Sequence, residues 1–121
     1  MEISKEFENL VRREIDRLYI PPTFRGHRYL VYIVGQIAAD PGRTEGITKD
    51  LYRETARCFH TNWSAVERSS RSAIAFCWKN DAGRERLCKL AGYRLTKRPA
   101  ISAFAAIVAQ YITDHYSTAA Y

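Results

Sequence analysis

Apolar residues recur at steps of three and four along most of the chain, which is the spacing of a helix that buries one face. We therefore expect an all-α fold, a compact bundle of about six helices containing a helix-turn-helix. No alternation of strands with helices and no glycine-rich phosphate loop is found. The predicted helices cover residues 3–19, 26–39, 48–58, 63–78, 84–90 and 100–116.

Short polar or proline-containing stretches separate these helices. The proline pair at 21 and 22 ends the first helix, because proline cannot donate to the helical ladder and pushes the residue before it out of the α region. The sequence DPGRTEG at 40–46 has the chemistry of a tight turn. Gly92 suits the left-handed cap that ends a helix. Residues 93–99, YRLTKRP, are expected to be extended or irregular, with one short strand as the alternative.

The first helix carries an apolar stripe on one side and charges on the other. We expect it to form an N-terminal amphipathic segment, residues 1–20, followed by a helix-turn-helix domain over residues 21–121. The stripe could dock on that domain or pair with the same helix of a second chain, and the spacing does not separate these two arrangements. The stripe consists of Ile3, Phe7, Leu10, Val11, Ile15 and Leu18.

The helices over residues 48–58 and 63–78 are joined by a short polar break, which is the arrangement of a helix-turn-helix. Thr48 is suited to cap the first of them. Thr61 or Asn62 can cap the second, because their side-chain oxygens can accept from backbone N–H groups of the next turn. The second helix of such a pair is the one that enters the major groove of DNA.

A helical wheel separates two faces of the second helix. One face is small or apolar and fits a core: Val66, Ser69, Ser70, Ala73, Ile74 and Cys77. The opposite face sets slim residues around two arginines: Ser64, Glu67, Arg68, Arg71, Ser72 and Ala75.

Small side chains beside long guanidinium groups suit a helix that enters the major groove of DNA and contacts base edges. An arginine can donate two parallel hydrogen bonds to guanine O6 and N7, or it can clamp a phosphate. Glu67 could accept from the amino group of cytosine, or it could hold Arg71, four residues on, in a helical ion pair.

The net charge of +6 falls mainly in the second half of the chain. Residues 84–98 contain six bases against the single acid Glu85. A basic surface fits an anionic partner, nucleic acid first, although a solvated charged face is the ordinary alternative. Lys49, Lys97 and Arg98 are the candidate phosphate contacts.

The sequence offers little for catalysis or metal binding. His27, His60 and His115 share no metal spacing with a cysteine or carboxylate, so we expect surface or locally satisfied histidines. The three cysteines form no C-x-x-C pair and are expected to be small core residues: Cys58, Cys77 and Cys88.

We therefore predict no enzyme, cofactor, metal or small-molecule substrate. The acids of the first helix, Glu6, Glu8, Glu14 and Asp16, are expected on a solvated face. Neither a leader sequence nor an apolar run of membrane-spanning length is recognisable, so a cytoplasmic protein that does not enter a membrane is expected.

The runs ITKDLY and TNWSAVERSSRSAIAFCW resemble the C-terminal DNA-binding effector domain of the sporulation master regulator, stage zero sporulation protein A. Weaker likeness continues through LAGY and through Pro99, Ser102 and Phe104, so the resemblance covers about residue 25 to the end. The matching positions in the two runs are Ile47, Thr48, Lys49, Leu51, Tyr52, Thr61, Ser64, Val66, Glu67, Arg68, Arg71, Ala73, Ile74 and Trp78.

The resemblance implies an all-helical domain that reads short DNA boxes through the second helix of the pair, often with two copies in tandem. For this chain, binding as a homodimer and binding as tandem copies are both left open. It implies base-edge or phosphate contacts for Ser64, Glu67, Arg68 and Arg71. We expect Thr48, Thr61, Asn62 and Ser72 to be further DNA contacts of the two helices. We accordingly expect a sequence-specific double-stranded DNA-binding protein that regulates transcription.

Several positions depart from the pattern of that family. Ala65 stands where the family has arginine, Ser70 replaces an isoleucine, and Ser72 replaces a histidine. Trp63 stands where a small residue is usual, and could pack on the preceding helix or lie against the sugar-phosphate backbone. The preferred DNA box is therefore expected to differ. No receiver domain precedes the helices in the sequence, so we expect no control through receiver phosphorylation.

The alternative function is a protein-binding adaptor or inhibitor that keeps the helical fold and uses its surface to occupy another protein. Salt dependence separates the two, because DNA binding weakens steeply as salt rises.

Overall fold

The computed structural model describes residues 4–40 and 49–120, with side chains for 4–40 and 50–116. It confirms the all-α fold, and no strand occurs within these residues. The short strand considered for residues 93–99 is absent, and these residues connect two helices without regular structure. The turn expected at 40–46 lies almost wholly outside the described residues. The helices are α1 (Lys5–Asp16), α2 (Arg25–Ala39), α3 (Lys49–Cys58), α4 (Trp63–Lys79), α5 (Asp81–Ala91) and α6 (Ile101–Ala120).

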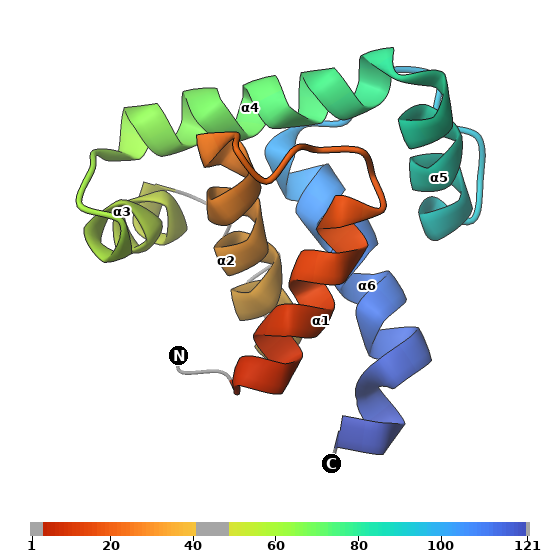
Figure 1. Ribbon diagram of the computed structural model, residues 1–121, viewed down its shortest axis with the longest axis horizontal. Coiled ribbons are helices and arrows are strands. Elements are labelled where there is room, and N and C mark those ends of the chain that lie inside the picture. Colours follow the sequence, from red (N-terminus) through yellow and green to blue (C-terminus); the bar gives the residue numbers. More distant parts are fainter. Residues whose placement is uncertain (1–3, 41–48, 121) are drawn as a thin grey trace.

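Helix α2 is the centre of the bundle. It packs against α1, α3, α4 and α6, and most of its residues are buried. Figure 1 shows α4 lying across one edge of the molecule, with α2, α1 and α6 running away from it on the same side. Such an arrangement leaves the opposite side of α4 facing outward.

A very close contact between α2 and α4 fixes the position of α4 on the bundle. A Cβ placed on Gly26 would lie 2.1 Å from the backbone oxygen of Ser69 and 2.8 Å from the Cβ of Ala73. Only glycine fits there, because real Cβ atoms do not approach other atoms so closely. The first turn of α2 therefore rests directly on the backbone of α4.

Helix α1 docks on the bundle with its apolar stripe inward. Val11, Ile15 and Leu18 are fully buried, and α1 contacts α2 and α6. The helix ends at Asp16 instead of continuing to residue 19, because Tyr19 adopts a left-handed conformation with φ 64°. After this turn, Ile20 is also buried, directly before the proline pair.

Glu14 is the clearest correction to the expected surface of α1. It was expected to be solvated, but its exposed fraction is 1%. Its carboxylate accepts from Arg17 at 3.1 Å, from Arg86 of α5 at 3.3 Å and from the hydroxyl of Tyr116 of α6 at 2.9 Å. A buried carboxylate is stable only with such partners, so Glu14 joins three helices through one side chain.

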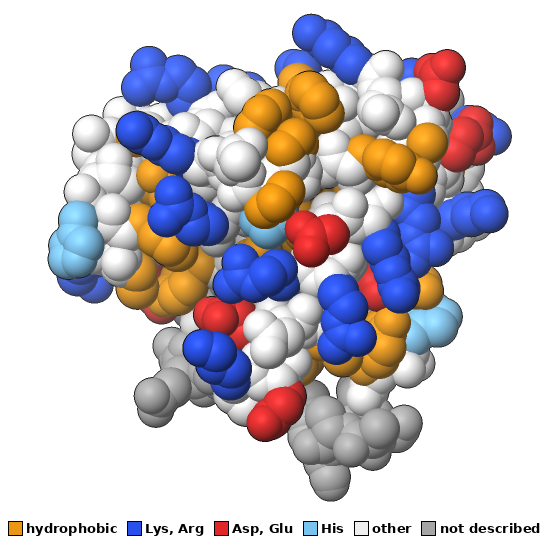
Figure 2. Space-filling model, viewed as in Figure 1, with side chains coloured by type: hydrophobic (Ala, Val, Ile, Leu, Met, Phe, Trp, Pro, Cys, Tyr) orange, Lys and Arg blue, Asp and Glu red, His pale blue; other side chains and the backbone are white. Residues whose placement is uncertain are grey.

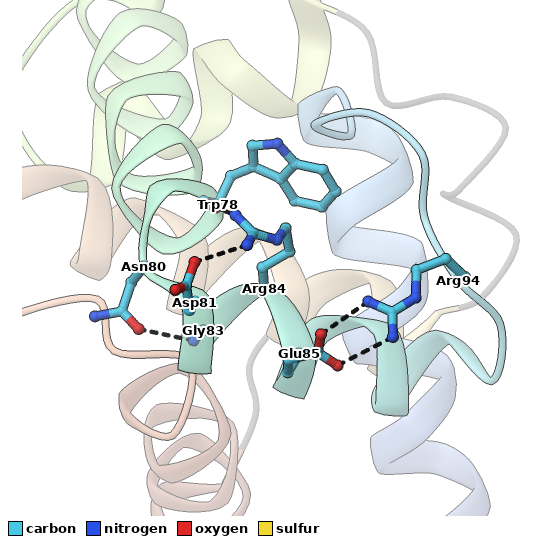
Figure 3. Close-up of polar contacts among 7 residues, drawn as sticks. All are labelled: Trp78, Asn80, Asp81, Gly83, Arg84, Glu85 and Arg94. Atoms are coloured by element: carbon cyan, nitrogen blue, oxygen red, sulfur yellow. Dashed lines mark hydrogen bonds and ion pairs between the residues drawn. The ribbon is translucent and has the colours of Figure 1, made fainter.

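The junction of α4 and α5 contains a single residue outside the helices. Asn80 ends α4 and caps α5, whose Gly83 N–H donates to its side-chain oxygen at 2.9 Å. Arg84 donates to the backbone oxygen of Trp78 at 2.9 Å and to Asp81 at 2.7 Å (Figure 3). At the other end of α5, Gly92 has φ 84° and forms the expected left-handed cap.

Candidate nucleic-acid interface

The turn between α3 and α4 is built by backbone hydrogen bonds that close the end of α3. The N–H of Thr61 donates to the carbonyl of Ala56 at 2.9 Å, and the N–H of His60 donates to that of Arg57 at 3.4 Å. His60 has φ 55°. This pattern of two bonds around a left-handed residue is a Schellman motif, with histidine in the position that glycine usually takes. The chain thereby leaves α3 and starts α4 in a new direction within a few residues.

Asn62, one of the two residues expected to cap the second helix, is the cap. Its side-chain oxygen accepts from the backbone N–H of Ala65 at 2.9 Å and from the hydroxyl of Ser64 at 2.8 Å. Asn62 and Ser64 are exposed, and Thr61 is half-buried in the turn. These three predicted site residues therefore lie together at the N-terminal end of α4.

The turn is held against α2 by an aromatic side chain. The ring of Phe59 packs edge-on against Tyr29, with centroids 5.3 Å apart, and against Tyr32 at 6.2 Å. Tyr32 in turn donates from its hydroxyl to Glu54 of α3 at 2.8 Å. The central helix α2 therefore fixes the positions of α3 and α4 relative to each other.

The inner face of α4 is buried as the wheel predicted. Val66, Ala73 and Cys77 have no exposed surface, and Ile74 is 1% exposed. Burial raises the pKa of the Cys77 thiol to about 12, so this cysteine stays protonated. Cys77 and Cys88 are core residues as expected. Cys58 is exposed at the end of α3, and its assignment to the core was wrong.

The outer face of α4 carries the remaining predicted site residues of this helix. Arg68 and Ser72 are exposed, and no hydrogen bond or ion pair of Arg68 occurs among the described residues. The Arg71 guanidinium lies 3.4 Å from the Glu67 carboxylate, with exposed fractions of 59% and 34% for the two side chains. The helical ion pair considered for Glu67 is therefore present, and both arginines remain accessible from outside.

Tyr52 of α3 lies beside this ion pair. Burial raises its pKa, and the carboxylate of Glu67 raises it further, whereas Arg71 lowers it. The phenol is therefore protonated and neutral at physiological pH. A neutral phenol adds no negative charge beside the outer face.

Two arginines that the sequence did not single out lie at the α2 side of α4. Arg25 and Arg28 are exposed in the first turn of α2. Their neighbour Gly26 rests on Ser69, and the ring of Phe24 packs edge-on against Phe76 of α4 at 5.0 Å. The signal that could have identified them was local: this first turn contains no acid, although acids are favoured at a helix N-terminus.

The other predicted phosphate contacts are distributed differently. Lys97 and Arg98 are exposed in the segment that connects α5 to α6. Thr48 and the side chain of Lys49 lie outside the described residues. Figure 2 shows lysine and arginine side chains along the edge formed by α4 and over much of the face below it.

The described side chains include no group of three or more histidine, cysteine, aspartate or glutamate residues placed to hold a metal ion. His27 is fully buried, and its Nε2 lies 2.7 Å from Asp16, whereas His60 and His115 are exposed. Within the described part of the chain, no helix combines the length and apolar character that a membrane span needs.

Comparison with known protein families agrees with this geometry. The model of the family described as Sporulation initiation factor Spo0A C terminal matches residues 11–112, so it includes the second half of α1 as well as the helix-turn-helix. The match starts earlier than the resemblance at about residue 25, and the buried residues Val11 and Ile15 of α1 belong to the same core as the rest of the domain. Because the match covers most of the 121 residues, the chain belongs to this family of DNA-binding transcription-regulator domains.

Proposed function

We propose that the chain is a sequence-specific reader of double-stranded DNA, with α4 as the helix that enters the major groove. The observation that carries this proposal is the two-sided character of α4: its inner face is buried and its outer face presents two accessible arginines between small side chains. A helix about 10–12 Å wide matches a groove about 12 Å wide only where its flanks are thin.

Arg68 is the foremost candidate for a base contact. It is exposed and free of partners among the described residues, so its guanidinium can take the two acceptors of a guanine without breaking an existing bond. Arg71 must loosen its pair with Glu67 to do the same. An exposed pair of this kind contributes only about 0.3–0.5 kcal/mol, against about 1–3 kcal/mol for a good base contact, so DNA can displace it.

Phosphate contacts would hold α4 in register without reading sequence. Arg25 and Arg28 are placed at the α2 side of α4 for this purpose, and Asn62, Ser64 and Ser72 are exposed at the N-terminal end and on the outer face of α4. Lys97 and Arg98 remain candidates for contacts farther along the duplex. Two such domains could bind as a tandem pair, each with its own α4 in the groove.

The test begins with selection of bound sites from random duplex DNA, followed by binding of Arg68→Ala. The variant should lose about 1–3 kcal/mol on the selected site and discriminate less at one base pair. Arg12→Ala, which removes a partly exposed arginine of α1, is the matched control and should bind as the unchanged protein does. An equal loss on every sequence would make Arg68 a phosphate contact. Absence of any DNA complex at about 100 mM salt would favour the protein-binding adaptor.

A further inference from the structure

A pocket lined mainly by charged residues lies between the end of α1 and α5, away from the outer face of α4. Its volume is about 440 Å³, and its lining comes from two segments far apart in the sequence. On the α5 side the lining residues are spaced three and four apart, so one face of that helix forms the wall. The lining residues are Arg17, Tyr19, Ala82, Glu85, Arg86 and Lys89.

The charges around the pocket leave an excess of positive charge. Arg17 and Arg86 share the one buried carboxylate of Glu14, which offsets only one of the two guanidinium charges. Glu85 is already held by Arg94 at 2.9 and 3.3 Å (Figure 3), and this pairing lowers the pKa of Glu85, so it stays ionised and matched. Lys89 is exposed and has no ion pair among the described residues. One guanidinium charge and one ammonium charge therefore remain uncompensated.

The rim of the pocket carries an aromatic ring in an unusual backbone conformation. Tyr19 has φ 64° and is 51% exposed, between the buried Leu18 and Ile20. Glycine adopts this conformation without strain, whereas a tyrosine does so at an energetic cost. The turn therefore holds a flat ring beside the cationic groups although a smaller residue would make the same turn more easily. Strained residues of this kind gather at binding sites.

We propose that this pocket binds a phosphorylated small molecule that carries a planar ring, such as a nucleotide. A phosphate monoester carries close to two negative charges at neutral pH, which matches the two uncompensated positive charges better than a carboxylate does. Arg17 keeps one nitrogen on Glu14 and presents the rest of its guanidinium to the phosphate, and Lys89 adds a point charge. The ring packs on Tyr19. The pocket is separate from α4, so this site does not depend on DNA binding.

The experiment is calorimetric titration of the full chain, without DNA, with adenosine monophosphate, inorganic phosphate and adenosine. The nucleotide should bind saturably at one site per chain, phosphate more weakly, and adenosine not measurably. Lys89→Gln should weaken the nucleotide about tenfold, as the loss of one charge-assisted hydrogen bond predicts. Lys89 makes no contact with Glu14 among the described residues, so this variant should fold normally. Lys5→Gln, which removes the same charge from the opposite end of α1, is the control and should bind the nucleotide unchanged.

Tyr19→Gly provides a second and independent readout. This variant should fold at least as well as the original, because glycine relieves the strain at φ 64°. It should bind the nucleotide no more tightly than phosphate, and Tyr19→Phe should restore the difference. The proposal is overturned if no titrant binds saturably, if Lys89→Gln and Lys5→Gln behave alike, or if a short DNA duplex displaces the nucleotide. The last result would assign these cations to the DNA backbone and would leave the role proposed for α4 intact.

Discussion

Ser70 is a polar residue enclosed on the inner face of α4. Its exposed fraction is 0%, and its hydroxyl has no hydrogen-bond partner in the described part of the chain. A buried hydroxyl without a partner keeps the cost of its desolvation and gains nothing in return. The position therefore lowers the stability of the fold.

We expect Ser70→Ala to raise the free energy of unfolding by about 1 kcal/mol, because it removes the unpaired group while leaving the packing nearly unchanged. Ser72→Ala on the outer face is the matched control, since it has the same effect on helix propensity without burial and should stay within about 0.5 kcal/mol. Urea denaturation of both variants measures the difference. Equal effects in the two variants would mean that the Ser70 hydroxyl has an acceptor.

Single residues were predictable where a periodic pattern decides their environment. The inner and outer faces of α4 follow from the spacing alone, and Arg68, Arg71 and Ser72 are exposed as the wheel predicted. Glu14 was not predictable, because its partners Arg86 and Tyr116 are about 70 and 100 residues away and only the tertiary fold brings them to it.

At the scale of elements, the contact between α2 and α4 has a functional consequence. Arg25 and Arg28 stand in the first turn of α2, where positive charge opposes the helix dipole. Replacing them should therefore leave the helix as stable as before or slightly more stable. If these arginines contact DNA, replacing them should lower the affinity for DNA although the helix is not destabilised.

The double variant Arg25→Gln/Arg28→Gln should bind DNA more weakly by a similar factor on specific and unrelated duplexes. The slope of log affinity against log salt should fall by about 2, one for each lost phosphate contact. Lys5→Gln/Arg12→Gln removes the same charge from α1 and should change the slope little. If both double variants shift the slope equally, only the net charge matters and α2 makes no phosphate contact.

The elements themselves were largely predictable, because all six helices have a buried stripe at helical spacing. The exact ends of the helices were less predictable. Helix α5 begins at Asp81, earlier than the expected Arg84, because Asn80 supplies a cap that apolar spacing does not reveal. The helix-turn-helix was predicted from one continuous stretch of sequence. The arginines of α2 that lie beside it were not, because their position depends on the contact of Gly26 with α4, between segments far apart in the sequence.

For the whole molecule, the network around Glu14 connects α1, α5 and α6. We expect Glu14→Ala to lower the free energy of unfolding by about 2 kcal/mol, because it leaves the part-buried Arg86 without its carboxylate. The value is below that for a fully buried pair, since Arg17 is half-exposed and can be solvated.

Glu8→Ala is the control for this prediction. Glu8 pairs with Arg12 at 3.5 Å on the same helix, and both side chains are about 40% exposed, so its loss should cost no more than about 0.5 kcal/mol. Denaturation in urea compares the two variants. A loss no greater for Glu14→Ala than for Glu8→Ala would show that the network adds little to stability.

The junction of α4 and α5 consists of Asn80 alone. Because this asparagine ends α4 and caps α5, and Arg84 of α5 donates to the backbone of α4, the junction contains no further residue that could absorb a movement. The two helices therefore keep a fixed angle, and α4 keeps its orientation on the bundle whether or not the pocket beside α5 is filled.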